Sequence, residues 1–250
     1  MKIIDINTMI GPWPSRLHRF NDEVSLIKEM DSYRITSAIT YSSIALNNPK
    51  EGNKHIKDIA EASNDRIKAC YILDSNIGSS EIPDASELMK QLKEEKPSAV
   101  KLYPNRNKYY LDSFYCGELL EVLDVLNMPV IIDSDQITSF KDLPQLAKSY
   151  SNIKFIILRY GFRESRTVIP LVKKLDNVYF DISVMVDTGL IEEIVNKYGS
   201  DKLLFGSGLP FYVPAGSLGM VIYARLKNSD KEKIFTGNWE YVEGGINYGD

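Results

Sequence analysis

The sequence contains few of the residues that bind transition metals. Its 250 residues include two His and two Cys, whereas zinc, iron and copper sites usually draw three or four ligands from these types and from carboxylates. A histidine-rich metal centre is therefore excluded. Cys70 and Cys116 could form at most one disulfide.

The sequence also lacks a leader, a long apolar run and an excess of basic residues. No positively charged apolar leader precedes the first strand-like run, MKIIDI, so we expect a cytoplasmic protein. No apolar run approaches the roughly 18 residues that a membrane span requires. The formal net charge of -4 is unlike that of a nucleic-acid-binding protein. We therefore expect a small-molecule ligand, no nucleic acid and no membrane.

Eight short apolar runs rich in β-branched residues recur along the chain, and segments with helical apolar spacing separate them. The runs cover residues 2–6, 36–41, 66–73, 98–103, 129–133, 153–158, 177–182 and 202–206. No linker or charge block divides the chain. The pattern therefore predicts an α/β fold with one domain over 1–250, a (β/α)8 TIM barrel, regular or distorted, in preference to a doubly wound sheet.

The ends of these runs carry most of the polar candidates for a site. In a barrel of this kind, function lies on the loops that leave the C-terminal ends of the strands. The polar and tyrosine side chains at these places are Asp5, Asn7, Lys101, Tyr103, Asp133, Asp135, Arg159 and Tyr160. We expect them to surround one shared cavity.

Seven short motifs resemble those of a known family. They stand in the order IIDINTMIG, AVKLYP, PVIID, FIILRYG, VYFDIS, LLFGSGLPF and KIFTGN. Together they resemble the amidohydrolase superfamily, in particular the branch called amidohydrolase 2, whose best-known members are decarboxylases and lactonases of small carboxylic acids. The resemblance follows the chain from end to end. It implies a TIM barrel with hydrolase or lyase chemistry, and related barrels often form homo-oligomers.

The residues depart from the family pattern where relatives carry metal ligands. Those five positions, four histidines and one aspartate in the family, hold Asn7, Met9, Asp133, Arg159 and Gly208. Met9 is a soft ligand, Gly208 has no side chain, and Arg159 is a permanent cation that would repel a metal. The sequence is similar to a divergent subset without the metal histidines, so we expect no metal and no cofactor.

Four residues are candidates for catalysis, namely Asp133, Lys101, Arg159 and His18. Lys101 and Arg159 together supply the charge of a divalent ion and would clamp an anion such as the carboxylate of a sugar acid. Asp133 or His18 would carry a proton. An equally weighted alternative is that Arg159 forms an ion pair with Asp133 or Asp5, which fills the space of the metal.

Five further residues are candidates for substrate binding, namely Asp5, Asn7, Tyr103, Tyr160 and Asp135. The two tyrosines would offer a ligand a flat apolar face and a hydroxyl. Asp5 would support the site or pair with a cation. Asp135 would form an acid/base pair with Asp133 or, alternatively, cap a turn.

The sequence leaves three functions open. The first is a metal-independent hydrolase or lyase that acts on a small carboxylate, lactone or sugar acid held by Lys101 and Arg159. The second is a non-catalytic binding protein that keeps the cavity without the chemistry, and the third is a scaffold subunit that pairs with an active relative. We expect the enzyme if Lys101, Asp133 and Arg159 converge on an open cavity.

Overall fold

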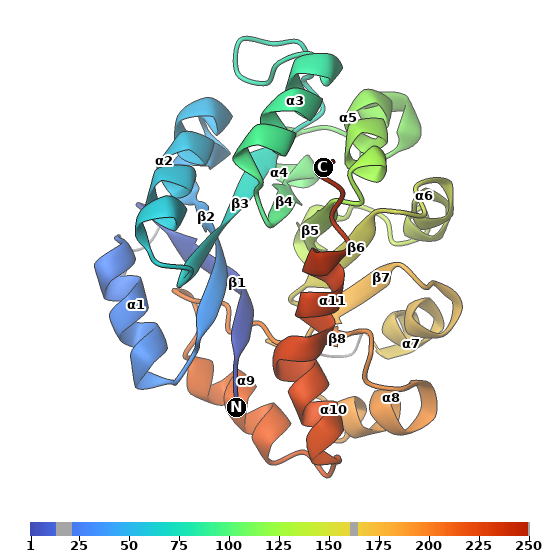
Figure 1. The fold of residues 1–250 in the computed structure, drawn as a ribbon. Coiled ribbons are helices and arrows are strands. Elements are labelled where there is room, and N and C mark those ends of the chain that lie inside the picture. Colours follow the sequence, from blue (N-terminus) through green and yellow to red (C-terminus); the bar gives the residue numbers. More distant parts are fainter. Residues whose placement is uncertain (14–21, 161–164, 250) are drawn as a thin grey trace.

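Eight parallel strands follow one another around a barrel in chain order, with helices outside them (Figure 1). The computed structural model describes residues 1–13, 22–160 and 165–249. The strands are β1 Ile4–Ile10, β2 Ser37–Ser42, β3 Ile67–Leu73, β4 Ala99–Leu102, β5 Pro129–Asp133, β6 Lys154–Leu158, β7 Val178–Asp181 and β8 Leu203–Leu204. Each of the eight predicted runs overlaps one strand, which confirms the predicted (β/α)8 barrel.

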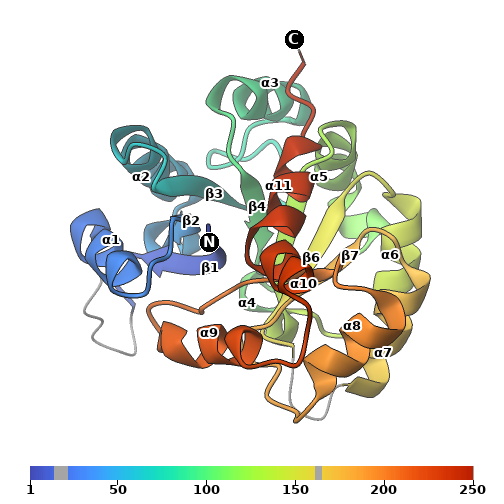
Figure 2. The same cartoon turned by 60° about the horizontal axis from the view of Figure 1, so that its bottom comes forward.

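Helices separate the strands and form the outer layer, as the second view also shows (Figure 2). The α-helices are α1 Glu23–Ser32, α2 Pro49–Ala62, α3 Ala85–Glu95, α4 Pro104–Asn107, α5 Ser113–Val125, α6 Leu143–Ser149, α7 Ser165–Lys174, α8 Leu190–Tyr198, α9 Pro214–Ile222, α10 Asn228–Glu232 and α11 Asn238–Gly244. Three short helical turns are η1 Ser43–Leu46, η2 Ser134–Gln136 and η3 Lys233–Gly237.

Irregular backbone pairing closes the barrel between its first and last strands. The Ile6 N–H donates to the Phe205 carbonyl at 3.0 Å, and the Met9 N–H donates to the Leu209 carbonyl at 3.0 Å. The regular part of β8 is only two residues long, so most of this seam lies in the segment that follows it.

A bulge in β1 determines which of its side chains face the inside of the barrel. Asp5 pairs with Ala38 and Thr8 pairs with Thr40, so β1 contains one residue more than β2 over the same stretch. Ile4 and Ile6 belong to the interior cluster before the bulge and Met9 after it, a shift by one residue from strict alternation.

Two apolar clusters hold the layers together. The larger one lies between the strands and the surrounding helices, and the smaller one fills the inside of the barrel. Trp239 of α11 belongs to the interior cluster and is 1% exposed. Because Asn238 donates to the carbonyls of Ser200 and Leu203 before β8 and within it, α11 covers the N-terminal ends of the strands.

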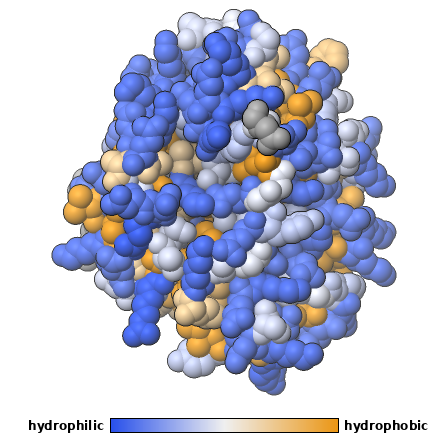
Figure 3. All heavy atoms as spheres, in the orientation of Figure 1, coloured by the Kyte–Doolittle hydropathy of each residue, from blue (hydrophilic) through white to orange (hydrophobic). Residues whose placement is uncertain are grey.

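The face that carries α11 is mostly hydrophilic, with apolar residues in small separate patches (Figure 3). Apolar residues scattered in this way are normal on a protein surface. Within the described ranges, none of the helices has the length and apolar character needed to cross a bilayer.

A side chain replaces part of the ladder between β2 and β3. The strands pair only as far as Thr40 and Ala69. Beyond that point the Asn53 amide of α2 donates to the Ile72 carbonyl at 2.9 Å, and its oxygen accepts from the Ile72 N–H at 2.8 Å. Asn53 is buried, so it satisfies two backbone groups that would otherwise have no partner there.

We expect Asn53→Ala to lower the free energy of unfolding by about 2–4 kcal/mol, because two buried backbone groups lose their partner. Urea denaturation measures the change. The exposed Asn228 provides the control, and Asn228→Ala should shift the free energy by less than about 0.5 kcal/mol. Equal effects of the two substitutions would contradict the role of Asn53.

Candidate active site

A pocket of about 310 Å³ opens at the C-terminal ends of the strands. Its lining comes from β1, β2, β4 and β5, from the segments that follow β1, β4, β5 and β6, and from the segment between β8 and α9. This is the end of the barrel where the sequence predicts the site. The volume is at the lower limit of ordinary ligand pockets, which suits a small molecule.

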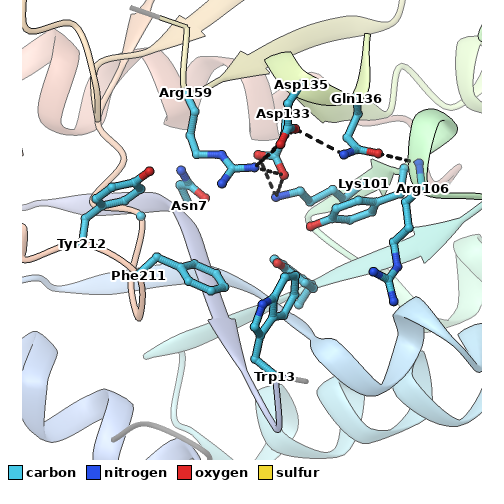
Figure 4. Close-up of a pocket in the computed structure, with 13 residues that line it drawn as sticks. Asn7, Trp13, Lys101, Arg106, Asp133, Asp135, Gln136, Arg159, Phe211 and Tyr212 are labelled. Atoms are coloured by element: carbon cyan, nitrogen blue, oxygen red, sulfur yellow. Dashed lines mark hydrogen bonds and ion pairs between the residues drawn. The ribbon is translucent and has the colours of Figure 1, made fainter. Parts of the chain in front are cut away.

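One carboxylate contacts two cations on the floor of the pocket (Figure 4). Asp133 ends β5, and its Oδ2 atom lies 3.2 Å from the Lys101 Nζ atom of β4. The same oxygen lies 3.1 Å from a terminal guanidinium nitrogen of Arg159, directly after β6. The side chains of Lys101 and Asp133 are 3% and 4% exposed, whereas that of Arg159 is 29% exposed. The three residues therefore converge as predicted, and Arg159 keeps the cluster open to the pocket.

Lys101 is held in its charged form. Its ammonium group lies 4.6 Å from the centre of the Tyr41 ring and 5.3 Å from that of the Tyr103 ring, as in a cation–π contact. Burial is the largest single cause and lowers the pKa of Lys101, but the contributions of Asp133, Tyr41 and Cys70 together outweigh it, so that this pKa is raised. Lys101 thus supplies a fixed positive charge rather than a neutral amine nucleophile.

Arg159 has an unusual backbone that a buried carboxylate stabilises. Its φ is +55°, a left-handed conformation that non-glycine residues seldom adopt. The Arg159 N–H donates to the Asp181 Oδ1 atom of β7 at 2.7 Å. The guanidinium group then contacts Asp133 and, at 3.4 Å, the exposed Asp135. Burial opposes the charged form of Arg159, but these two carboxylates raise its pKa further above the usual value.

A second polar layer lies below the pocket floor. The Asn7 amide donates to the Asp181 Oδ2 atom at 3.2 Å. Burial raises the pKa of Asp181 to about 6, although the hydrogen bonds from the Arg159 N–H and the Asn7 amide lower it. Gly206 fits against Asp181 because a Cβ atom there would lie 2.5 Å from its Oδ2 atom.

Asp5 is a second fully buried carboxyl group of this layer. Its Oδ1 atom accepts from the backbone N–H groups of Asn7 at 3.0 Å and Ser207 at 2.9 Å. Its Oδ2 atom has no hydrogen-bond partner in the described part of the chain. Burial raises the pKa of Asp5 to about 7, with a smaller contribution from Asp181 in the same direction. A protonated Asp5 is therefore a large part of the population near neutral pH.

Aromatic side chains form the wall of the pocket that faces the cluster of Lys101, Asp133 and Arg159. Trp13 and Phe211 meet edge to face, with ring centres 5.0 Å apart. Tyr212 lies beside them and is 45% exposed. Gly208 has a φ of +76°, and a Cβ atom there would lie 2.5 Å from the Tyr212 ring. A glycine at this position thus lets the aromatic wall approach the floor.

The structure brings most of the predicted site residues together, but not all of them. The predicted residues that line the pocket are Asn7, Lys101, Tyr103, Asp133, Asp135 and Arg159. Asp5 lies beneath the floor instead. Tyr160 does not line the pocket, because the chain turns outward after Arg159 and the Tyr160 ring packs against Phe140 and Phe180. His18 lies outside the described residues.

The alternative prediction for Arg159 is also present in the structure. Arg159 pairs with Asp133 rather than with Asp5. The pair does not seal the cavity, so convergence and charge pairing occur together.

Several lining residues were not selected from the sequence. Arg106 and Gln136 were not among the predicted positions, whereas Trp13, Tyr41, Phe211 and Tyr212 lie at or after the ends of the predicted strands but were not chosen as site residues. Arg106 lies in the four-residue helix α4, and Gln136 ends the turn η2. The sequence offered one indication of these residues, namely that each lies within a few residues of a strand end. Many surface residues share this property, so it does not select them.

The sequence comparison now identifies the family. A family model described as amidohydrolase matches residues 79–238, more than half of the chain. The chain belongs to the amidohydrolase family. No curated protein sequence matches this amidohydrolase.

Solved structures share the fold of this amidohydrolase at low sequence identity. An uncharacterised TIM-barrel protein from Bordetella bronchiseptica has a TM-score of 0.78 at 14% identity, covering 98% of this chain and 99% of that one. A 5-carboxyvanillate decarboxylase from Sphingomonas paucimobilis has a TM-score of 0.74 at 11% identity, covering 97% and 99%. A 4-oxalomesaconate hydratase from Rhodopseudomonas palustris has a TM-score of 0.68 at 17% identity, covering 97% and 96%.

The residues at the expected metal positions of this amidohydrolase do not form a donor set. Met9 is packed into the barrel interior and is 1% exposed. Asp133 already contacts two cations, one of them Arg159. Across residues 1–13, 22–160 and 165–249, no group of three His, Cys, Asp or Glu side chains could hold a metal ion. The residues present therefore do not fit the metal that the family resemblance implies.

We expect Asp133→Ala to lower the free energy of unfolding by about 3–5 kcal/mol, because it leaves the Lys101 charge buried without its partner. The double variant Lys101→Met with Asp133→Ala should regain a large part of this loss. Chemical denaturation of the three proteins measures it. If the double variant is no more stable than the single one, the loss comes from the cavity and not from the charge.

The buried Asp5 predicts how stability depends on pH. Its folded pKa of about 7 lies above the usual 3.8, so the folded state binds more protons than the unfolded state between these values. Its contribution to stability is therefore present at low pH and is lost as pH rises from about 4 to 7.

We expect Asp5→Asn to remove this dependence, so that the variant gains on the order of 2–4 kcal/mol relative to the parent between pH 4 and pH 8. Unfolding free energies over this range measure the difference. The exposed Asp65 gives the control variant Asp65→Asn, whose curve should parallel that of the parent. Parallel curves for Asp5→Asn as well would rule out the pH effect.

Proposed function

We propose that this amidohydrolase is a metal-independent hydrolase or lyase that acts on a small carboxylate, lactone or sugar acid. One observation carries the proposal: Lys101, Asp133 and Arg159 converge at the floor of an open pocket. The family is one of hydrolase- and lyase-like enzymes, with decarboxylase and hydratase structures among the neighbours. Because residues at the metal positions do not form a donor set, the chemistry is assigned to the cluster itself.

Each member of the cluster has a distinct role in this proposal. Arg159 is the most exposed of the three, so those of its guanidinium N–H groups that do not contact Asp133 or Asp135 donate to a ligand oxygen on which negative charge develops. Asp133 accepts or returns the proton. Lys101 keeps the carboxylate oriented and offsets its charge while the proton moves. These roles use one cluster for both charge stabilisation and proton transfer.

A non-catalytic binding protein is the second candidate. The observation that favours it is the mutual pairing of Lys101 and Asp133 at 3.2 Å with both side chains almost fully buried. A pair that only fills the former metal position would hold the pocket open and leave the ligand unchanged. Binding and turnover must therefore be measured separately.

We expect a screen of sugar acids, lactones and aromatic carboxylates to yield a ligand that stabilises the protein, by about 2.7 kcal/mol when it is present at 100 times its dissociation constant. Arg159→Ala should abolish this stabilisation. Arg225→Ala, which removes a side chain that is 88% exposed and does not line the pocket, should preserve it. Thermal unfolding gives the readout.

The same ligands test the chemistry and the metal. If NMR shows that the protein converts the ligand and that Asp133→Asn abolishes this conversion, the enzyme is supported. Binding without conversion supports the binding protein. Dialysis against a chelator should leave conversion unchanged. Stoichiometric zinc or manganese in the purified protein, with activity lost on its removal, would overturn the metal-independent proposal.

A further inference from the structure

Not every charged side chain that lines the pocket has a partner of opposite charge among the described residues. Lys101 and Arg159 both contact Asp133, and Arg159 also contacts Asp135. These two cations and two carboxylates balance each other formally. The floor is therefore a hydrogen-bonding surface with little net charge, and it does not by itself neutralise an anionic ligand.

Arg106 supplies the remaining charge of the lining. It projects from α4, directly after β4, and lines the same pocket. Its guanidinium group donates to the neutral Asn47 side chain at 3.2 Å. In the described part of the chain, no carboxylate lies within 4.0 Å of it. With three cations and two carboxylates, the lining has a formal charge of one positive unit, located at Arg106.

Hydrogen bonds hold the backbone that carries Arg106. Its N–H donates to the Gln136 side-chain oxygen at 2.9 Å. The Gln136 amide donates to Asp135 at 3.2 Å, and Asp135 contacts Arg159. Figure 4 shows this chain of contacts running from Arg159 to Arg106 along one side of the pocket. The backbone of Arg106 is thus fixed relative to the floor, and its exposed side chain is held by the contact with Asn47.

The floor in turn offers an unused polar group. The Tyr103 hydroxyl is buried and has no hydrogen-bond partner in the described residues, although Tyr103 lines the pocket. A buried polar group without a partner is costly. A ligand oxygen on the floor would satisfy it if the Tyr103 ring turns slightly toward the pocket.

Building on the proposed function, we propose that Arg106 determines specificity by binding the carboxylate that does not react. The ligand class is then a hydroxy- or oxo-monocarboxylate. Its carboxylate lies at Arg106, and its oxygen function lies at the opposite end, near Tyr103 and Arg159. Because Arg106 is the lining cation that no carboxylate of the described residues pairs with, one ligand carboxylate finds a partner there, whereas a second carboxylate meets two cations that already pair with Asp133 and Asp135.

Matched probes test the charge at one end of the ligand. The first pair is 4-hydroxybenzoate and its neutral amide, and the second pair is D-gluconate and D-gluconamide; 4-hydroxyisophthalate is the dianion. Calorimetry on the parent protein should show that one acid or both bind at least about tenfold more tightly than the matched amide, as expected for one charged hydrogen bond. The dianion should gain nothing over 4-hydroxybenzoate.

Variants then distinguish the contribution of Arg106 to binding from that of the residues on the floor. Arg106→Gln should weaken binding of the acid at least about tenfold and leave the amide unchanged, and Arg106→Lys should restore part of the difference. Lys108→Gln removes a charge from an exposed neighbour that does not line the pocket and should change neither probe. A purely structural role of Arg106 would weaken acid and amide alike.

The outcomes also distinguish the two proposals. If Arg159→Ala abolishes binding of the acids while Arg106→Gln does not weaken it, the role of Arg106 is wrong and the proposed function stands. If Arg106→Gln abolishes it and Arg159→Ala has no effect, the carboxylate is assigned correctly but the floor is not the reacting centre. If neither acid binds the parent protein more tightly than its matched amide, the role of Arg106 is wrong, whereas the proposed function is decided by the conversion assay.

Discussion

The contact of one carboxylate with two cations determines the character of this barrel mouth. Asp133 lies between Lys101 and Arg159, which come from the strands on either side of it or directly after them. Without Asp133 the positive charges of Lys101 and Arg159 would lie close together in a largely buried site, with no negative charge between them. With it, they stay charged and close together. The position that the family resemblance assigns to a metal is therefore occupied by charged side chains of the protein itself.

The polar layer beneath the floor depends on this arrangement and supports it in return. Asp181 holds the left-handed backbone of Arg159, and Asn7 holds Asp181. Asp5 holds the backbone on both sides of the seam between β1 and β8. The floor is therefore supported from below by two buried carboxyl groups that accept hydrogen bonds from the backbone.

The fold and the centre of the site could be predicted from the sequence because both follow from the order of short apolar runs and from the residues at their ends. Neighbouring strands of a parallel barrel end at the same edge, so Lys101, Asp133 and Arg159 had to meet. The choice of Asp133 over Asp5 as the partner of Arg159 could not be predicted, since it depends on how β1 and β8 close. Arg106 lies in a helix of four residues, too short for a periodic signal, and Tyr160 follows a left-handed turn that no pattern reveals.

The bulge in β1 has a genetic consequence. One extra residue between Asp5 and Thr8 brings Asn7 to the pocket and Met9 to the barrel interior. The loss of a single codon there would remove the bulge and leave one residue, Ile6 or Asn7, opposite Ile39, while Thr8 and Met9 keep their partners in β2. If Asn7 is the residue lost, the pocket loses one of its polar groups and Asp181 loses one hydrogen-bond donor, by an in-frame deletion in one step and without any substitution in the other seven strands.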